Sequence, residues 1–315
     1  MCGVSSRTVS VRRRRLLRAL VACTVLLALA GYLAVHFQTS GPGSPRCAVR
    51  APGQDGETYE LEPQQAVNAA TIAAVGSARR LPERAVTIAL ATAMQESALR
   101  NIRYGDRDSL GLFQQRPTQG WGTPEQIMDP VYSAGAFYDH LVKVPGYSRL
   151  PLTVAAQQVQ RSGFPQAYAK HEPNAALLTS ALTGRAEASL SCAPGAQEQP
   201  GDPVRVREKL QREFGRDVLA GGAGRVGGAG KSGSPGPVVS VPVPETAPGG
   251  PERRGWELAH WAVAHARELR IAQVSYAGRV WSASSSGNGW RPEAAGSSAA
   301  ARKRAAAAVV ITTVQ

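Results

Sequence analysis

The sequence is poor in cysteine and histidine, with four cysteines and five histidines among 315 residues. The histidines are scattered and no Cys-x-x-Cys pair occurs. The chain therefore lacks the ligand spacing typical of structural zinc sites. We expect neither a bound metal nor a cofactor.

The expected folded domain at residues 47–192 also lacks an excess of basic side chains. The net charge is +13, but residues 1–46 carry +7 of it and residues 193–315 carry +6. Residues 47–192 hold 13 basic and 13 acidic side chains. A nucleic-acid-binding domain carries its basic patch on the folded part, so we expect no nucleic-acid partner.

The N-terminal region has the charge pattern of a membrane anchor. Basic residues at 12–15 and Arg18 precede an uncharged apolar run at 19–37, which contains only His36 as a titratable group besides Cys23 and Tyr32. At about 1.5 Å per residue this run spans roughly 28 Å, close to the thickness of the hydrocarbon layer. Positive charge on its N-terminal side predicts a cytoplasmic tail at 1–15 and a single-pass signal-anchor at 16–37.

Two other interpretations of this segment remain open. Ala28-Leu29-Ala30 could serve as a cleavage site for a removable signal peptide. The Leu20–Cys23 segment imitates a lipoprotein attachment box, although almost no apolar stretch precedes it. The apolar run continues beyond residue 30, which favours an uncleaved anchor. Each version places the bulk of the chain outside the cytoplasm.

The cysteine positions agree with export. Cys2 lies in the expected cytoplasmic tail and Cys23 within the expected anchor, which leaves Cys47 and Cys192 as an exported pair. In an oxidising compartment such a pair is expected to form a disulfide. Closing this long loop would stabilise the fold by about 4–5 kcal/mol. The alternative is two unpaired thiols at the domain margins.

Residues 47–192, after a short stalk at 38–46, predict a mainly α-helical domain. Proline and aspartate residues suited to helix N-termini precede apolar periodicities. The expected helices cover residues 63–77, 82–97, 129–144, 153–160 and 173–184. Residues 101–123 lack an apolar period and predict a long loop with a short strand or turn at 110–114, and loops of this length are often functional.

The central helix carries one acidic residue at its end. Its segment Ala85–Met94 is apolar on every face, and Glu96 follows directly. Burial and the partial negative charge of a helix C-terminus both raise the pKa of such a carboxyl. A general acid needs this property near neutral pH. The alternative is a glutamate that simply leaves the core at the helix end.

Two short motifs give this helix and loop a family resemblance. Glu96-Ser97 followed by Gly111-Leu112-Phe113-Gln114 resembles the Glu-Ser and Gly-Leu-Met-Gln motifs of lysozyme-like lytic transglycosylases, over roughly residues 60–185. The family's Ala-Tyr-Asn motif is matched by Ala167-Tyr168-Ala169, without the asparagine. The run at 105–111 is similar to membrane-anchored or secreted actinobacterial proteins of this superfamily.

The resemblance implies a lysozyme-like fold and peptidoglycan as the partner. Glu96 would protonate the glycosidic oxygen between N-acetylmuramic acid and N-acetylglucosamine. In the family the muramyl 6-hydroxyl then attacks and an anhydro product forms, so one carboxylate suffices. Asp106 and Asp108 are candidates for a second carboxylate, which most glycosidases need. Their alternative role is to cap the turn that contains them.

Five further residues are candidates for contact with the substrate. Gln114 and Gln115 could bind acetamido groups, and Trp121 or Tyr168 could stack on a sugar face. Ser97 could orient Glu96 or cap the helix end. The alternative for each is a half-buried structural role.

The C-terminal third predicts less order. An amphipathic helix at about 203–219 and a disordered Gly- and Pro-rich linker at 220–250 make up the region 193–250. Residues 251–315 predict a small α+β module with an Ala-rich tail. Its pattern resembles a helix-plus-hairpin module of secreted actinobacterial cell-wall proteins, but it lacks their late His-Asp-His-Val-His stretch, so no site is carried over.

Three functions follow from these features. The first is a membrane-anchored enzyme that cleaves extracytoplasmic peptidoglycan strands, and the second is a non-catalytic lysozyme-fold protein that binds glycan or scaffolds an envelope complex. A salt bridge from Glu96 to Arg100 or Arg116 would favour the scaffold. A transport-associated or regulatory membrane protein is the third, although one spanning segment without a polar pathway argues against transport. No particular protein partner is indicated.

Overall fold

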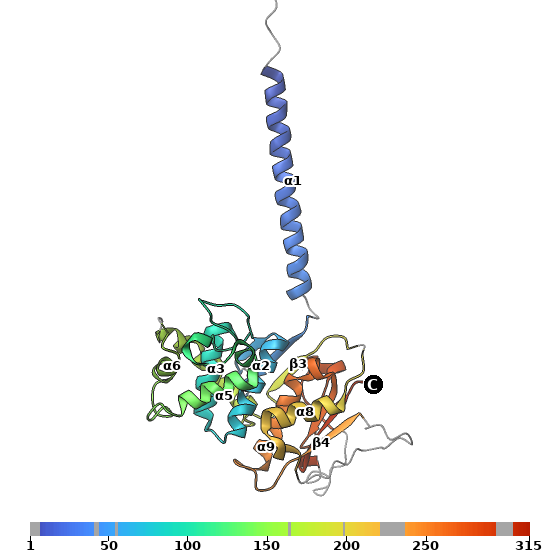
Figure 1. Cartoon of the computed structure of the whole chain (residues 1–315). Coiled ribbons are helices and arrows are strands. Elements are labelled where there is room, and N and C mark those ends of the chain that lie inside the picture. The colour runs from blue at the N-terminus through green and yellow to red at the C-terminus, as the bar shows by residue number, and fades with distance from the viewer. Residues whose placement is uncertain are drawn as a thin grey trace, which may run out of the picture. The chain divides into compact units, whose positions relative to one another are not determined.

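The computed structural model describes residues 7–40, 44–53, 56–162, 165–197, 199–220, 237–293 and 305–315. Contacts between residues divide the chain into two units, Met1–Ser44 and Pro45–Gln315. The first unit contains α1 (Arg7–Ser40), drawn in blue in Figure 1. The anchor expected at 16–37 falls within this helix. Among the described residues, no helix combines the length and apolar character needed to cross a membrane.

The second unit combines helices with two small sheets (Figure 1). About half of the chain is helical. The longer helices of this unit are α2 (Pro63–Ala78), α3 (Glu83–Ser97), α5 (Pro130–Leu141), α6 (Leu152–Gln160), α7 (Glu172–Leu182), α8 (Pro203–Phe214) and α9 (Pro251–Ala264). Short helices occur at α4 (Pro124–Ile127), α10 (Ala266–Leu269), η1 (Pro117–Gln119), η2 (Pro165–His171), η3 (Arg216–Leu219) and η4 (Ala283–Asn288).

Local sequence explains where many of these helices begin. Pro63, Pro130 and Pro203 each occupy the first turn, where a missing backbone N–H leaves no hydrogen bond unmade. Asp129 caps α5 by accepting from the Val131 amide at 3.0 Å. These starts agree with the sequence prediction because helix N-termini are set by residues next to one another in the chain.

The first sheet joins strands from the two ends of the predicted helical domain. Its strands are β1 (Arg46–Arg50), β2 (Thr58–Leu61) and β3 (Leu190–Ala193), in the order β2-β1-β3. Cys47 lies opposite Cys192 in the antiparallel pairing of β1 with β3, and the two form a disulfide. The predicted disulfide is thus confirmed. A bridge between residues 145 apart stabilises the fold by about 4–5 kcal/mol in the chain-entropy model.

The second sheet corrects two expectations. Its strands β4 (Val238–Pro242), β5 (Ile271–Tyr276), β6 (Arg279–Ser282), β7 (Arg291–Pro292) and β8 (Ala308–Thr313) run in the order β4-β8-β5-β6-β7. β4 falls in the stretch expected to be disordered, and β8 falls in the expected tail. Both alternate between more and less buried residues and both pair with partners far away in sequence, which local composition does not reveal. Residues 221–236 of the expected linker lie outside the described residues.

The C-terminal region shares its core with the helical domain. Helix α9 packs against α2, α7 and β3. Buried apolar residues form one cluster that includes Ile88 of α3, Trp261 of α9 and Ile311 of β8. A module too small to bury much core by itself therefore obtains its burial by packing on the neighbouring helices.

Candidate functional site

Glu96 is the penultimate residue of α3, whose preceding residues are buried without interruption from Ala85 to Met94. The helix ends at Ala98 and Leu99, which adopt the left-handed conformation with φ of 52° and 59°. This abrupt end brings the half-buried Glu96 to the margin of the core. A carboxyl in this place experiences the negative end of the helix dipole as well as partial desolvation.

The side chain of Glu96 is held by uncharged donors. The Tyr168 hydroxyl of η2 donates to Glu96 Oε1 at 2.7 Å. The Gln160 side chain at the end of α6 is a second uncharged group whose hydrogen bonding lowers the pKa of the same carboxyl. Burial is the largest influence on the carboxyl and raises its pKa, and the two hydrogen bonds offset only part of this rise. Glu96 is therefore easier to protonate than an ordinary glutamate.

The two arginines expected as partners of Glu96 in a scaffold bind other carboxylates instead. Arg100 pairs with Glu62 at 2.7 Å, and Arg116 pairs with Asp108 at 2.6 Å. Within the described part of the chain, Glu96 has no ion pair. The salt bridge that would have favoured a scaffold is not formed there.

The turn at residues 111–114 is fastened to the Glu96 helix. Leu110 pairs with Gln115 in an isolated antiparallel bridge, so the turn is short and closed. Ser97 Oγ donates to Leu112 O at 2.8 Å. Gly111 has φ of 76°, and a Cβ there would lie 2.7 Å from Ile127 O. A glycine is thus required at this position by both conformation and space.

Four residues expected to contact substrate make contacts within the protein through their side chains. Gln115 is buried and donates to Ser133 O at 3.0 Å, and Gln114 donates to Gly111 O at 3.2 Å. The Trp121 ring stacks on His140 with 4.1 Å between centroids. Tyr168 is fully buried with its hydroxyl on Glu96. These residues shape the surroundings of the acid, and Ser97 links the acid's helix to the turn.

The two aspartates expected as second carboxylates have different surroundings. Asp108 accepts from Arg116 and, at 2.6 Å, from the Thr118 hydroxyl. Hydrogen bonds from Thr118 and Arg116 hold the pKa of Asp108 far below its ordinary value. Asp106 is 91% exposed, with Arg107 3.9 Å away. The geometry of Asp108 is that of a loop-fastening residue.

Gln160 is the residue of this site that sequence reasoning missed. It is the last residue of the segment Gln157-Gln158-Val159-Gln160, in which three glutamines look alike. Only the folded structure singles it out, since its amide donates to Phe113 O at 2.7 Å and its side chain lowers the pKa of Glu96. No local motif distinguishes it from Gln157.

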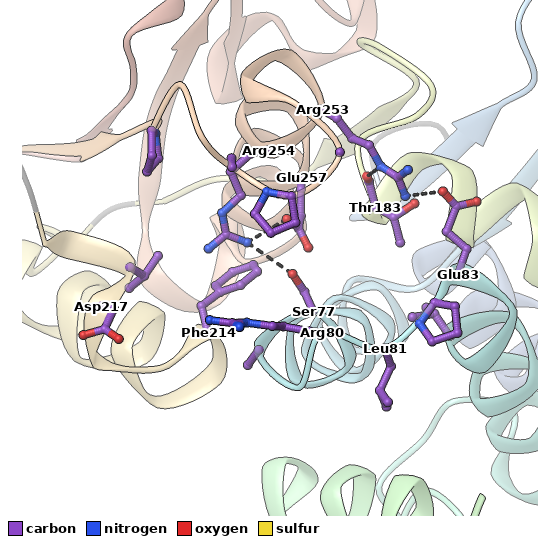
Figure 2. A pocket seen from close by; sticks show the side chains of 18 of the residues that line it. Ser77, Arg80, Leu81, Glu83, Thr183, Phe214, Asp217, Arg253, Arg254 and Glu257 are labelled. Carbon is purple, nitrogen blue, oxygen red and sulfur yellow. Dashed lines mark hydrogen bonds and ion pairs between the residues drawn. The ribbon is translucent and has the colours of Figure 1, made fainter. Parts of the chain in front are cut away.

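A separate cleft of about 830 Å³ lies where α2 and α3 meet the C-terminal region (Figure 2). Figure 2 shows Arg253 directed at Glu83, and Arg254 directed at Ser77 and Glu257. These arginines are therefore engaged by the walls of the cleft. They join the two regions of the unit, and none of the residues expected to form the Glu96 site lines this cleft.

Comparison with known proteins gives one partial match. A sequence profile described as VldE, C-terminal domain, matches residues 201–303. The match covers about a third of the chain, from α8 into the segment after β7, and it supports a C-terminal module. No curated protein matches the chain.

Proposed function

We propose that this protein cleaves the glycan strands of peptidoglycan with Glu96 as general acid and then general base. The observation that carries the proposal is the environment of Glu96: a carboxyl at the end of a buried helix, with a raised pKa and a hydrogen bond from the uncharged Tyr168 hydroxyl. A glutamate used only for structure would be expected to have a cationic partner or full exposure. The resemblance of the Glu96-Ser97 and 111–114 motifs to lytic transglycosylases supplies the substrate class.

The proposed reaction has two proton transfers through one carboxyl. Protonated Glu96 gives its proton to the glycosidic oxygen as the bond from that oxygen to C1 of the muramyl sugar breaks, and the electron pair stays on the oxygen. The muramyl 6-hydroxyl then attacks C1 and passes its proton to the Glu96 carboxylate. The acid is restored, no water is consumed, and the product is a 1,6-anhydro sugar.

The contacts of Glu96 suit this cycle. Because Tyr168 donates to Oε1, the other oxygen can carry the transferred proton. The donors stabilise the carboxylate produced in the first step, whereas burial favours the protonated form before it. These influences act in opposite directions, and a residue acting first as acid and then as base needs both.

The proposal includes an extracytoplasmic location. It is supported by the Cys47–Cys192 disulfide, since disulfides persist mainly in oxidising compartments. The C-terminal region is proposed as an accessory part, because it packs on the helical domain and is fixed to it by buried contacts.

Digestion of purified peptidoglycan tests the proposal. The oxidised full chain and its Glu96→Gln variant would each be incubated with substrate, and the soluble products would be analysed by mass spectrometry. Anhydro-muropeptides from the unchanged protein, with release at least ~100-fold slower from the variant, are the expected result. Products with reducing ends would mean hydrolysis and overturn the single-carboxylate mechanism.

A second measurement interprets the case in which the unchanged protein cleaves no peptidoglycan. The unchanged protein would also be tested for co-sedimentation with peptidoglycan after circular dichroism has verified its fold. A folded protein that sediments with peptidoglycan but releases no product would reject the enzyme and favour the non-catalytic glycan-binding protein.

A further inference from the structure

His260 of α9 connects the C-terminal region, residues 193–315, to the helical domain. Its side chain is fully buried. Its Nδ1 lies 2.8 Å from Ala181 O near the end of α7, and its Nε2 lies 3.2 Å from the Ser189 amide just before β3. One imidazole ring is therefore bonded to the backbone of two different segments of the helical domain.

The two partners determine the protonation state of His260. A carbonyl oxygen can only accept, so Nδ1 carries a hydrogen and donates it to Ala181 O. A backbone amide can only donate, so Nε2 carries no hydrogen and accepts from Ser189. Only the neutral ring with its hydrogen on Nδ1 meets both requirements. A second proton, on Nε2, would point at the Ser189 N–H, and the bond between them would be lost.

The surroundings of the ring also favour the neutral form. The rings of Trp256 and Trp290 lie beside His260, with 5.5 Å and 6.0 Å between centroids. Burial in this place lowers the pKa of His260 to about 4, against a weaker opposite effect of the bond to Ala181.

The elements that pack against α9 carry few charged groups. α2, β3 and β8 have none, and β5 has only Tyr276 as a titratable group. Glu172 of α7 pairs with Arg84, and Glu268 of α10 pairs with Lys209. The other titratable side chains of residues 183–189 and 251–269 are Arg185, Glu187, Glu252, Arg253, Arg254, Glu257, His265 and Arg267. None of these groups contributes to the lowered pKa of His260.

The disulfide does not enclose the C-terminal region. It joins Cys47 to Cys192, so the closed loop ends just before this region begins. Two tryptophans assist His260 in the contact: Trp290 Nε1 donates to Leu190 O at 2.8 Å, and Trp281 Nε1 donates to Ser191 Oγ at 3.2 Å. Of these three side chains from the C-terminal region, only the imidazole can gain a charge in acid.

We propose that His260 is an acid-sensitive latch between the C-terminal region and the helical domain. The neutral ring holds α9 against Ala181 and Ser189. Protonation of Nε2 breaks the bond from Ser189 and releases the region. Because Arg253 and Arg254 line the 830 Å³ cleft together with residues of α2 and α3, release also opens that cleft. The latch is independent of the glycan cleavage proposed above.

The dependence of docking on pH follows from the two states of the ring. The docked ring has the lowered pKa of about 4, and the released ring has the ordinary pKa of 6.5. Docking is therefore at full strength above pH 6.5 and weakens as pH falls through the range between the two values. From pH 7 to pH 5, the equilibrium constant for release should rise about 20-fold.

Hydrogen exchange of the full chain, followed by mass spectrometry, measures this release. After correction for the effect of pH on the chemical exchange rate, amides of α9 and β5 should open about 20-fold more often at pH 5 than at pH 7. Amides of α3, which lies within the disulfide-closed domain, should change less than about threefold. An equal increase in α3 would mean global unfolding and would overturn the proposed release.

The variant His260→Gln tests the residue itself. Glutamine can offer its carbonyl oxygen to the Ser189 amide but gains no charge, so the difference between pH 7 and pH 5 should disappear from α9 and β5. His140→Gln is the matched control, because that ring is exposed and stacks on Trp121 within the helical domain. It should keep the full pH dependence. A dependence that persists in His260→Gln would overturn the latch.

NMR of the unchanged protein decides the question even if His260→Gln does not fold. The ¹⁵N signals of the imidazole distinguish a hydrogen on Nδ1 from one on Nε2 and follow protonation of the ring. We expect the Nδ1–H form at pH 7 and protonation that coincides with the opening of α9. An Nε2–H form at pH 7, or a ring that becomes protonated while α9 stays docked, would contradict the inference.

Discussion

Glu96 and Glu213 are the same residue type in the same local position, and they have opposite properties. Each is the penultimate residue of its helix, Glu96 in α3 and Glu213 in α8, and each is at least partly buried. Desolvation is the largest single influence on both carboxyls and raises both pKa values. Yet the pKa of Glu96 remains raised, whereas that of Glu213 is lowered.

The difference lies in the partners. Glu213 Oε1 lies 3.5 Å from Lys209 Nζ and 3.6 Å from His265 Nε2, and its Oε2 accepts from Trp261 Nε1 at 2.7 Å. Attraction to His265 and Lys209, together with the hydrogen bonds, outweighs desolvation at Glu213. Glu96 has hydrogen-bond donors without charge. Burial raises the pKa of both carboxyls, and the additional partners of Glu213, which Glu96 lacks, reverse the direction of the shift.

The largest effect is expected from Glu213→Gln. The substitution leaves Lys209 and His265 beside a neutral amide in a buried place, and removing one partner of a buried pair costs about 3–5 kcal/mol. Urea denaturation should show this loss in the free energy of unfolding at pH 7. Glycan cleavage per folded molecule should be unchanged, and a loss of activity without loss of stability would contradict the structural role assigned to Glu213.

The same substitution should also change how stability depends on pH. A lowered folded-state pKa contributes stability that is present above the unfolded value, about 4.3, and lost as pH falls through the folded value. The unfolding free energy of the unchanged protein should therefore fall more steeply below pH 4.5 than that of Glu213→Gln.

Tyr168→Phe should have the next largest effect. It removes the hydroxyl that donates to Glu96, so the pKa of Glu96 should rise further and kcat should fall about tenfold. The alkaline limb of the pH–rate profile should move to higher pH. Tyr138→Phe is the matched control, since its hydroxyl is also buried but donates to Ile72 O at 3.0 Å. If the alkaline limb of the pH–rate profile moved equally in both variants, the specific role assigned to Tyr168 would be wrong.

Glu96→Gln should increase stability at pH 7 by about 1 kcal/mol, or ~2–4 °C in melting temperature. Because the folded-state pKa is raised, the folded protein binds more protons than the unfolded chain between the two pKa values, and stability falls as pH rises through that range. A neutral glutamine avoids this loss. Calorimetry at pH 7 and pH 3.5 should show the gain only at the higher pH, and a destabilised variant at pH 7 would contradict the raised pKa.

Asp108→Asn should have the smallest effect. Its carboxylate holds Arg116 and Thr118, which fastens the loop without a role in proton transfer. Cleavage should change by less than about threefold, far below the ~100-fold or more expected for loss of a catalytic acid or base. A loss comparable with that of Glu96→Gln would restore Asp108 as a second carboxylate.

The sequence best predicted those features of the fold that are determined by residues next to one another in the chain. The starts of α2, α5 and α8, with their prolines, follow from local chemistry. The apolar run before Glu96 likewise placed a carboxyl at the end of a buried helix. The strands β4 and β8 were missed because their only evidence is alternation over about five residues, which acquires meaning through distant pairing.

At the candidate site, residue types were easier to predict than their contacts. Tyr168 and Trp121 were expected to face a sugar, because an aromatic near an acid is a common sugar-binding feature. The structure directs one at Glu96 and the other at His140. The direction of a side chain depends on packing between helices that are far apart in sequence, and so does the choice of Gln160 over its neighbouring glutamines.

The strand order of the second sheet also constrains how the chain can be made. β4 finds its described pairing partner in β8, which lies about seventy residues later. At a synthesis rate of about 5–20 residues per second, β4 waits several seconds with its hydrogen-bonding groups unmatched. An unpaired strand edge readily recruits other chains. Newly made protein is therefore expected to depend on chaperones during this interval, and a chain interrupted before residue 308 would expose that edge permanently.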